Sequence, residues 1–180
     1  MFRWPAAGHD FGSGMSQFHM TESATFALMP RPPREQRPGY YHVTTRGNFD
    51  ANIYLANDDR HLFLALLNRT ARDLSWSIHA WCLMTNHFHL IVEIPSENLS
   101  AGMHRLNGVY ARWFNERHDR TGHLFERRFS AKWIEGDEQL HNTAEYILQN
   151  PVKAGLCSNP FDWPWLGGKL LVAARPARAA

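Results

Sequence analysis

Alternating hydrophobic and polar positions along the chain predict four strands. Residues 40–48 ("YYHVTTRGN") are rich in β-branched and aromatic residues and stop at a Gly-Asn pair, which is typical of a strand followed by a turn. Residues 76–84 ("WSIHAWCLM") and 87–94 ("HFHLIVEI") predict two further strands, and the short link between them predicts a hairpin. Alternation returns in residues 122–135 ("GHLFERRFSAKWIE"), where we expect the fourth strand.

Helical spacing occurs between and after these strands. Residues 58–74 begin with acidic residues and place leucines on one face, and residues 100–118 repeat apolar residues at offsets of three and four. Residues 136–150 carry acids near their start and are expected to end before Pro151, because the residue before a proline disfavours the α conformation. The order β-α-β-β-α-β-α predicts an α+β fold: a ferredoxin-like split β-α-β arrangement, with an antiparallel sheet, helices on one face and an added C-terminal helix.

The two ends of the chain lack this periodicity. Residues 1–38 end in a proline-rich stretch that prevents regular helix or central strand, so we expect a disordered or loosely packed extension there. Residues 39–166 form one predicted domain, which is large enough to bury a core without disulfides or a structural metal. The aromatic residues of "SNPFDWPWLGG" (158–168) are expected to pack on this body, and residues 167–180 are expected to form a C-terminal tail.

Composition narrows the class of protein. No apolar run approaches the roughly 20 residues that cross a bilayer, and the start of the chain lacks the pattern of a secretory signal. Two cysteines are too few for a disulfide framework, so we expect a cytoplasmic protein. The net charge of +2 says little about nucleic acid, but residues 104–133 hold seven basic and three acidic residues interleaved with aromatic ones. This composition suits the binding of phosphates and bases, and it is equally typical of a solvated helix face beside core aromatics.

The sequence "TNHFHL" (85–90) places His87 and His89 two positions apart in a predicted strand. Alternation puts both imidazoles on one face, with Phe88 on the other. Two imidazoles at this spacing can converge on one divalent ion, or they can be structural histidines whose nitrogens find partners in a half-buried face. A metal site would need a further ligand from elsewhere in the chain.

The last predicted helix offers such a ligand. Tyr146 and Asn150 lie four residues apart and therefore share a helix face, and an amide oxygen such as that of Asn150 suits Mg²⁺ or Mn²⁺. A metal ion can polarise a phosphodiester while a tyrosine hydroxyl attacks the phosphorus. The sequence thus predicts a phosphoryl-transfer site if this helix lies beside the histidine pair.

Four motifs in their order resemble a known family. "YYHVTTRGN", "WCLMTNHFHLIVEIP", "RTGHLFERRF" and "AEYILQNPVKAGL" are similar to motifs of the HUH single-tyrosine transposases, and most of all to REP-associated tyrosine transposases. The resemblance covers roughly residues 30–165. It implies a ferredoxin-like domain that cuts and rejoins single-stranded DNA at or beside a short hairpin of the REP type, with a divalent metal, Mg²⁺ or Mn²⁺, and without a nucleotide cofactor.

The resemblance also implies roles for particular residues. His87 and His89 become the metal-binding pair, Asn150 the polar metal ligand, and Tyr146 the nucleophile that forms a 5′-phosphotyrosine and frees a 3′-hydroxyl. Lys153 corresponds to a recurring lysine that meets phosphate. By the same resemblance we expect a monomer whose site is complete in one chain, although the sequence leaves open whether the tyrosine serves its own chain or a partner.

Other basic side chains are candidates for DNA contacts. His42 and Arg46 share a face of the first predicted strand and either line the DNA path or pair with acidic neighbours. Four arginines are candidates for contacts to the DNA backbone, which give affinity without sequence choice: Arg105, Arg112, Arg127 and Arg128.

Three alternatives stay open at this stage. The chain could be a domesticated descendant that binds hairpin DNA or structured RNA without cutting, although such a binder needs none of the proposed catalytic set. It could be a zinc hydrolase that adds Cys82 or His79 to the histidine pair, although these residues do not share one face in an obvious way. Tyr110 is a rival nucleophile, but it falls in the apolar stripe of its helix, and Phe114 one turn later cannot hold a metal.

Overall fold

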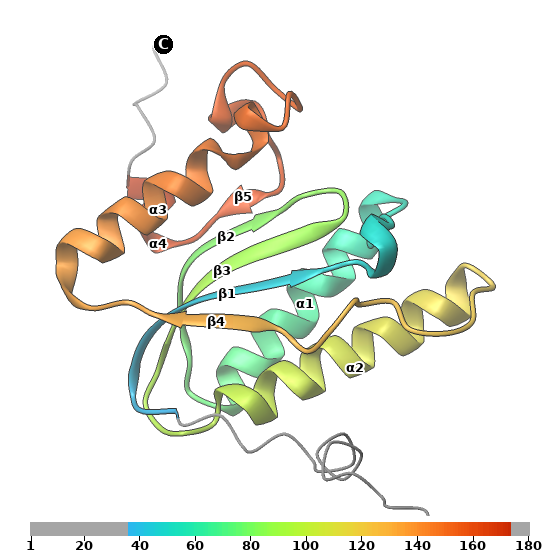
Figure 1. Cartoon of the computed structure of the whole chain (residues 1–180), viewed down its shortest axis with the longest axis horizontal. Coiled ribbons are helices and arrows are strands. Elements are labelled where there is room, and N and C mark those ends of the chain that lie inside the picture. Colours follow the sequence, from blue (N-terminus) through green and yellow to red (C-terminus); the bar gives the residue numbers. More distant parts are fainter. Residues whose placement is uncertain (1–35, 174–180) are drawn as a thin grey trace, which may run out of the picture. The chain divides into compact units, whose positions relative to one another are not determined.

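The structure, a computed structural model, describes residues 36–173, and Figure 1 shows how its elements are arranged. The sequence predictions for residues 1–35 and 174–180 therefore lie outside the described part of the chain. The elements follow in the order β1 (Gly39–Arg46), a 3₁₀ helix η3 (Asn48–Asp50), α1 (Asn57–Asp73), β2 (Ser77–Leu83), β3 (His87–Ile94), α2 (Leu99–Arg117), β4 (Ser130–Trp133), α3 (Gly136–Lys153), a 3₁₀ helix η4 (Pro160–Asp162), β5 (Leu166–Gly167) and α4 (Lys169–Ala173).

The strands form one antiparallel sheet in the order β4-β1-β3-β2-β5. The first four strands have the ferredoxin-like order, so the predicted fold class is confirmed. The central pair, β1 and β3, runs in continuous register from Gly39 opposite Ile94 to Arg46 opposite His87. The two-residue strand β5 pairs with β2 and was not predicted, because two residues are too few to show an alternating pattern.

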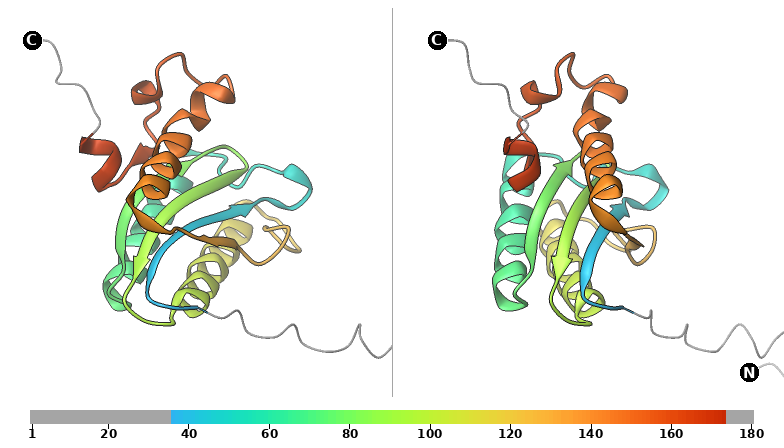
Figure 2. Two further views of the ribbon diagram at one scale, coloured as in Figure 1. Left: turned by 60° about the vertical axis from the view of Figure 1, so that its left-hand side comes forward. Right: turned by 90° about the vertical axis from the view of Figure 1, so that its left-hand side faces the viewer.

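Helices cover both faces of the sheet, which corrects the prediction that they lie on one face (Figure 2). On one face, Phe88 and Leu90 of β3 pack in a large core with residues of α1 and α2. On the other face, Ile91 of β3 belongs to a smaller core with Ile147 and Leu148 of α3 and with part of α4. Because β3 is apolar on both faces, each face must be covered, and α3 supplies the second cover.

The fourth strand is shorter than predicted, spanning Ser130–Trp133 in place of residues 122–135. Leu124 and Phe129 are both buried although an odd number of positions separates them, which an alternating strand would not allow. The backbone N–H of Glu126 still donates to the carbonyl of Arg46 at 3.0 Å. Residues 127–129 then leave the ladder before β4 begins, so they form a short bulge at the sheet edge.

Helix α3 continues through Pro151 to Lys153, whereas the sequence predicted an end at Asn150. Pro151 lies in the last turn, where a proline removes only one backbone hydrogen bond, and it is buried, as is Ile147 one turn earlier. Packing therefore outweighs the local preference of the residue before proline. As a result Tyr146, Asn150 and Lys153 all belong to one continuous helix.

No helix within residues 36–173 combines the length and apolar character needed to cross a membrane.

Candidate metal and tyrosine site

A cavity of about 380 Å³ lies between the sheet and α3. Three strands and one helix contribute its lining: His42, Thr44, Thr45 and Arg46 from β1, His87 and His89 from β3, Ser130 and Lys132 from β4, and Tyr146 and Asn150 from α3. The structure therefore brings together the predicted histidine pair, the predicted nucleophile and the predicted amide ligand.

Strand register assembles the floor of this cavity. Alternation along β1 turns His42, Thr44 and Arg46 to the same face, and pairing with β3 sets Thr44 opposite His89 and Arg46 opposite His87. On the other side of β1, Lys132 of β4 lies opposite His42. Lys132 was not predicted as a site residue, although its alternation with Ser130 in "SAKW" indicates that both side chains lie on one face of the strand.

Helix α3 presents Tyr146 over this floor. The stripe formed by Ile147 and Leu148 is buried against the sheet, which fixes the rotation of the helix. The Tyr146 ring lies edge-on to His89, with 5.6 Å between ring centroids, and its centroid is 6.0 Å from that of His42. Tyr146 remains 45% exposed, so its phenol is accessible to a large substrate.

Asn150 follows Tyr146 by one helical turn. Its side-chain nitrogen Nδ2 donates to the backbone carbonyl of Tyr146 at 2.7 Å. This bond occupies the amide nitrogen and leaves the amide oxygen, the better metal ligand, for the cavity that the side chain lines.

The hydrogen bonds of the histidine pair leave one nitrogen of each ring without a partner among residues 36–173. His87 Nδ1 donates to Asn86 Oδ1 at 2.7 Å, which leaves the lone pair on His87 Nε2. His89 Nδ1 lies 3.0 Å from His42 Nε2, and His89 Nε2 is buried without a hydrogen-bond partner in the described part of the chain. Asn86 in turn donates to the backbone carbonyl of Asp50 at 3.3 Å, so it holds both the turn and the His87 ring.

Burial keeps these imidazoles neutral. Desolvation lowers the pKa of His42 and His87 to about 4 and that of His89 to about 3. Nearby basic groups act in the same direction: Lys132 on His42, Arg46 on His87, and the other two histidines with Arg46 on His89. Neutral imidazoles carry the lone pairs that a metal ligand needs.

The residues fit a divalent cation bound by two nitrogens and one oxygen. The orphaned Nε2 of His89 is the strongest sign, because a buried polar atom without a partner is costly unless something binds it. Within residues 36–173, no three side chains of His, Cys, Asp or Glu are grouped to hold a metal. The fit therefore depends on the amide oxygen of Asn150 as the third ligand.

The zinc hydrolase alternative lacks a suitable ligand. Cys82 lies directly opposite His89 on β2, so the two do share a face, contrary to the sequence-based expectation. Burial, however, raises the pKa of the Cys82 thiol to about 12, and its sulfur lies 3.5 Å from that of Met84. His79 Nε2 is paired with Glu93 at 2.9 Å. A thiol whose deprotonation is opposed by burial is a poor zinc ligand.

The rival nucleophile Tyr110 lies in the other core of the molecule. Its ring is fully buried, and its hydroxyl donates to the backbone carbonyl of Ile53. Burial also raises the pKa of Tyr110 strongly, which opposes formation of a phenolate. Tyr110 is therefore a structural residue.

Basic residues border the cavity on two sides. The Lys153 ammonium lies 5.3 Å from the centroid of the Tyr146 ring, and the exposed Lys132 lines the cavity from β4. Arg46 also lines it and forms an exposed ion pair with Asp50 at 2.7 Å. These cations surround the position where a phosphate bound beside Tyr146 would lie.

The four arginines of the sequence analysis lie outside this cavity. Arg105 pairs with Asp73 at 2.8 Å, which joins α2 to the end of α1, and Arg112 is exposed on α2. Arg127 and Arg128 belong to the bulge before β4, where they line a second cavity. DNA contact by these residues stays a prediction.

A ferredoxin-like sheet with a histidine pair on its central strand and a tyrosine helix packed over it defines the class of single-tyrosine HUH proteins. Residues 36–150 match the family model described as "Transposase IS200 like", which is more than half of the chain. The chain belongs to this family of IS200-like transposases.

Two further proteins are similar to the chain. A Haemophilus influenzae protein assigned as a REP-associated tyrosine transposase is 27% identical over 114 residues, which cover 57% of this chain and 65% of that protein. The chain thus matches slightly less than two thirds of that relative's length. The solved structure of a REP-associated tyrosine transposase bound to a REP hairpin shares the fold, with a TM-score of 0.62 at 21% identity over 77% of this chain and 82% of that one.

Proposed function

We propose that this protein is a metal-dependent endonuclease and strand-transferase for single-stranded DNA, with Tyr146 as its nucleophile. One observation carries the proposal: the phenol ring of Tyr146 lies against His89, whose Nε2 is buried and has no hydrogen-bond partner among the residues that the structure describes. Metal-assisted phosphoryl transfer needs a nucleophile beside an atom that is available to bind the metal.

The metal ligands are His87 Nε2, His89 Nε2 and the side-chain oxygen of Asn150. A bound Mg²⁺ or Mn²⁺ supplies positive charge that polarises the phosphodiester. The chain's own residues do the remaining work. Lys132 and Lys153 bind the phosphate oxygens, and α3 holds the Tyr146 hydroxyl on the cavity side of the helix.

The reaction has two steps, cleavage and strand transfer. The Tyr146 oxygen attacks phosphorus and loses its proton to water, while the bond from phosphorus to the 3′-oxygen breaks and that oxygen takes up a proton. This step leaves a 5′-phosphotyrosine and a free 3′-hydroxyl. In the second step a 3′-hydroxyl of another strand loses its proton to water and attacks the same phosphorus, while the bond from phosphorus to the Tyr146 oxygen breaks and that oxygen takes up a proton, so no nucleotide cofactor is consumed.

The DNA partner is a single strand that carries a short hairpin of the REP type. Family membership and the likeness to a protein solved with a REP hairpin support this partner. Both histidines, Tyr146 and Asn150 line one cavity of one chain, which supports a monomer that cuts with its own tyrosine.

A covalent adduct tests the proposal. The protein is incubated with labelled single-stranded hairpin DNA and Mn²⁺ or Mg²⁺, and the products are separated under denaturing conditions. We expect an adduct from the unaltered chain and from Tyr40→Phe, a half-buried tyrosine on the same sheet face, and none from Tyr146→Phe. An adduct of undiminished yield from Tyr146→Phe would refute the nucleophile, and tight binding without any adduct would favour the non-cleaving hairpin binder.

A further inference from the structure

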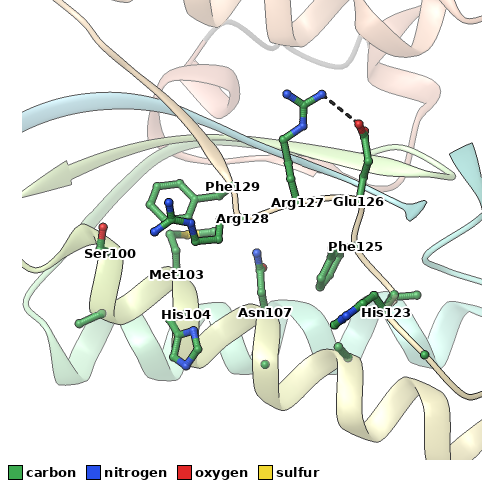
Figure 3. Close-up of a pocket in the computed structure, with 15 residues that line it drawn as sticks. Ser100, Met103, His104, Asn107, His123, Phe125, Glu126, Arg127, Arg128 and Phe129 are labelled. Carbon is green, nitrogen blue, oxygen red and sulfur yellow. Dashed lines mark hydrogen bonds and ion pairs between the residues drawn. The ribbon is translucent and has the colours of Figure 1, made fainter. Parts of the chain in front are cut away.

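A second cavity, of about 750 Å³, lies between α2 and the segment 122–129 (Figure 3). It falls within the range of about 300–1,000 Å³ that is typical of ligand sites. The reaction described above does not use it. Its lining combines three kinds of surface, each suited to part of a nucleotide.

The first kind is an open floor on α2. Gly108 and Ala111 line the cavity one turn apart, and a Cβ atom at Gly108 would have no neighbour within 4 Å. Because these two lining residues are small, they leave room for a flat group to lie against the helix.

The second kind is an aromatic and polar wall opposite this floor. Phe125 of the segment and Asn107 of α2 both line the cavity, and Figure 3 shows their side chains in the view between the segment and the helix. Phe125 is only partly buried, so part of its ring is accessible. An aromatic face beside amide and imidazole groups is the combination that stacks an unpaired base and contacts its polar edge, and His123 adds the imidazole.

The third kind is positive charge at the rim. Arg128 lines the cavity, is exposed, and forms no ion pair with any residue between 36 and 173. Its neighbour Arg127 pairs with Glu126 at 3.1 Å and points away from α2 in Figure 3. Arg128 therefore supplies the unpaired positive charge at this rim.

This cavity adjoins the Tyr146 cavity through the bulge. Arg128 and Phe129 line the second cavity, and Ser130, the next residue, lines the first. Asn107 of the second cavity donates to the Thr45 hydroxyl at 3.3 Å, and Thr45 also lines the first cavity. A strand whose phosphate lies at Tyr146 can therefore reach the second cavity by crossing residues 127–129.

We propose that this second cavity binds an unpaired nucleobase of the single strand next to the scissile phosphate. The inference rests on the proposed function, because it takes the DNA bound at Tyr146 as its starting point. Paired bases in a hairpin stem have both faces stacked and their edges engaged, so only an unpaired base can insert here, and the flank beside the scissile phosphate is the unpaired segment next to this cavity. The site therefore contributes to selectivity for the flanking sequence and not to affinity for the hairpin stem.

The test fills the cavity with a larger side chain. Gly108→Leu projects into the open floor and also replaces glycine in a helix by a better helix former, so the variant should fold. Ala65→Leu, at an exposed position of α1 that lines none of the described cavities, is the matched control. Arg128→Ser, paired with the control Arg72→Ser on exposed α1, gives a second route that leaves the core unaltered.

Binding is measured by fluorescence anisotropy without divalent metal, so that no cleavage intervenes. The DNA is a hairpin with a single-stranded flank, or the same hairpin without it, and 2-aminopurine replaces successive flank bases in a parallel experiment. We expect Gly108→Leu to weaken binding of the flanked hairpin by about 5-fold or more, as expected for loss of one stacked base, and to abolish the fluorescence change of one 2-aminopurine position. Binding of the bare hairpin and both controls should be unchanged.

Unchanged affinity for the flanked hairpin in both Gly108→Leu and Arg128→Ser would overturn the inference. Equal weakening for the bare hairpin would also overturn it, since the cavity would then contact the stem or the loop and not the flank. The covalent-adduct assay is independent of these measurements. If no adduct forms with the unaltered chain while Gly108→Leu still loses the flank-dependent affinity, the proposed cleavage fails and the base site stands.

Discussion

The ring of Tyr146 on α3 lies perpendicular to the ring of His89 on β3, at 5.6 Å between centroids. The contact joins a helix on one face of the sheet to its central strand, and it depends on the burial of Ile147 and Leu148 that fixes the helix rotation. A turn of α3 by one residue would carry the phenol about 100° around the helix axis and away from the histidines. The following predictions test what this placement requires.

His42 should control metal affinity without being a ligand. Its Nε2 lies 3.0 Å from His89 Nδ1 and can fix the ring so that His89 Nε2 points toward the cation. We expect His42→Ala to weaken Mn²⁺ binding by about 10- to 100-fold, and His42→Gln, which keeps a hydrogen-bonding group, to restore part of it. Titration followed by electron paramagnetic resonance of free Mn²⁺ measures this affinity directly.

The control for that experiment is His141→Ala, an exposed histidine on α3 outside the Tyr146 cavity. It should bind Mn²⁺ like the unaltered chain. Equal Mn²⁺ affinity in His42→Ala and His141→Ala would show that His42 has no part in the metal site.

The free energy of unfolding should fall as the pH is lowered from 7 to 5. The pKa values of His42, His87 and His89 are about 4, 4 and 3 in the folded chain, below the ordinary value of about 6.5. Below pH 6.5 the unfolded chain therefore takes up protons that the folded chain does not. The stabilisation is complete above that pH and is lost as the pH falls toward the folded pKa values, by at most about 1.4 kcal/mol per pH unit for each histidine.

Urea unfolding at several pH values measures this dependence. His89→Asn removes the histidine with the lowest pKa, so its unfolding free energy should vary less steeply with pH than that of the unaltered chain. The same slope in both proteins would contradict the burial of a neutral His89.

Tyr110→Phe should lower the free energy of unfolding and leave DNA cleavage unchanged. The variant leaves the buried carbonyl of Ile53 without its hydrogen bond, which costs about 1–3 kcal/mol. Chemical denaturation should detect this loss, while the yield of covalent DNA adduct from the folded variant should equal that of the unaltered chain. A stable Tyr110→Phe variant without adduct would instead make Tyr110 the nucleophile.

Lys132 should contribute to DNA affinity through its charge. It is exposed, lines the Tyr146 cavity and makes no ion pair with any residue of the described chain. We expect Lys132→Ala to weaken single-stranded DNA binding and to reduce the slope of log affinity against log salt by about 0.7, as for loss of one phosphate contact. Arg105→Ala is the comparison, because Arg105 is already paired with Asp73, and it should change the slope less.

The sequence predicts those parts of the site that depend on local periodicity. The spacing of His87 and His89 in a strand, and that of Tyr146 and Asn150 in a helix, is enough to place each pair on one face. The hydrogen bond between His42 and His89 could not be predicted in this way, because it depends on the register between β1 and β3. The register depends on packing across the whole sheet, so it cannot be inferred from the sequence of either strand alone.

The fold shows the same division. Alternation and helical spacing predict the seven helices and strands from β1 to α3, but they do not say which face of the sheet each helix covers, and α3 lies on the face opposite α1 and α2. Segment 122–129 has the composition of a strand, yet Leu124 and Phe129 are both buried. Two backbone hydrogen bonds hold the segment in place: Asn48 of η3 donates to Leu124, and Glu126 donates to Arg46 at the end of β1. Such a path is set by tertiary contacts that leave no periodic signal.

The shortness of the outer strands has a consequence for self-association. The sheet ends in the four-residue β4 on one side and the two-residue β5 on the other. β4 is preceded by a bulge and carries a lysine, and β5 is followed by Gly168 at a positive φ of 110°. Neither border offers a long row of open backbone groups to an incoming strand, which disfavours growth of the sheet from one molecule into the next and protects the protein from aggregation by that route.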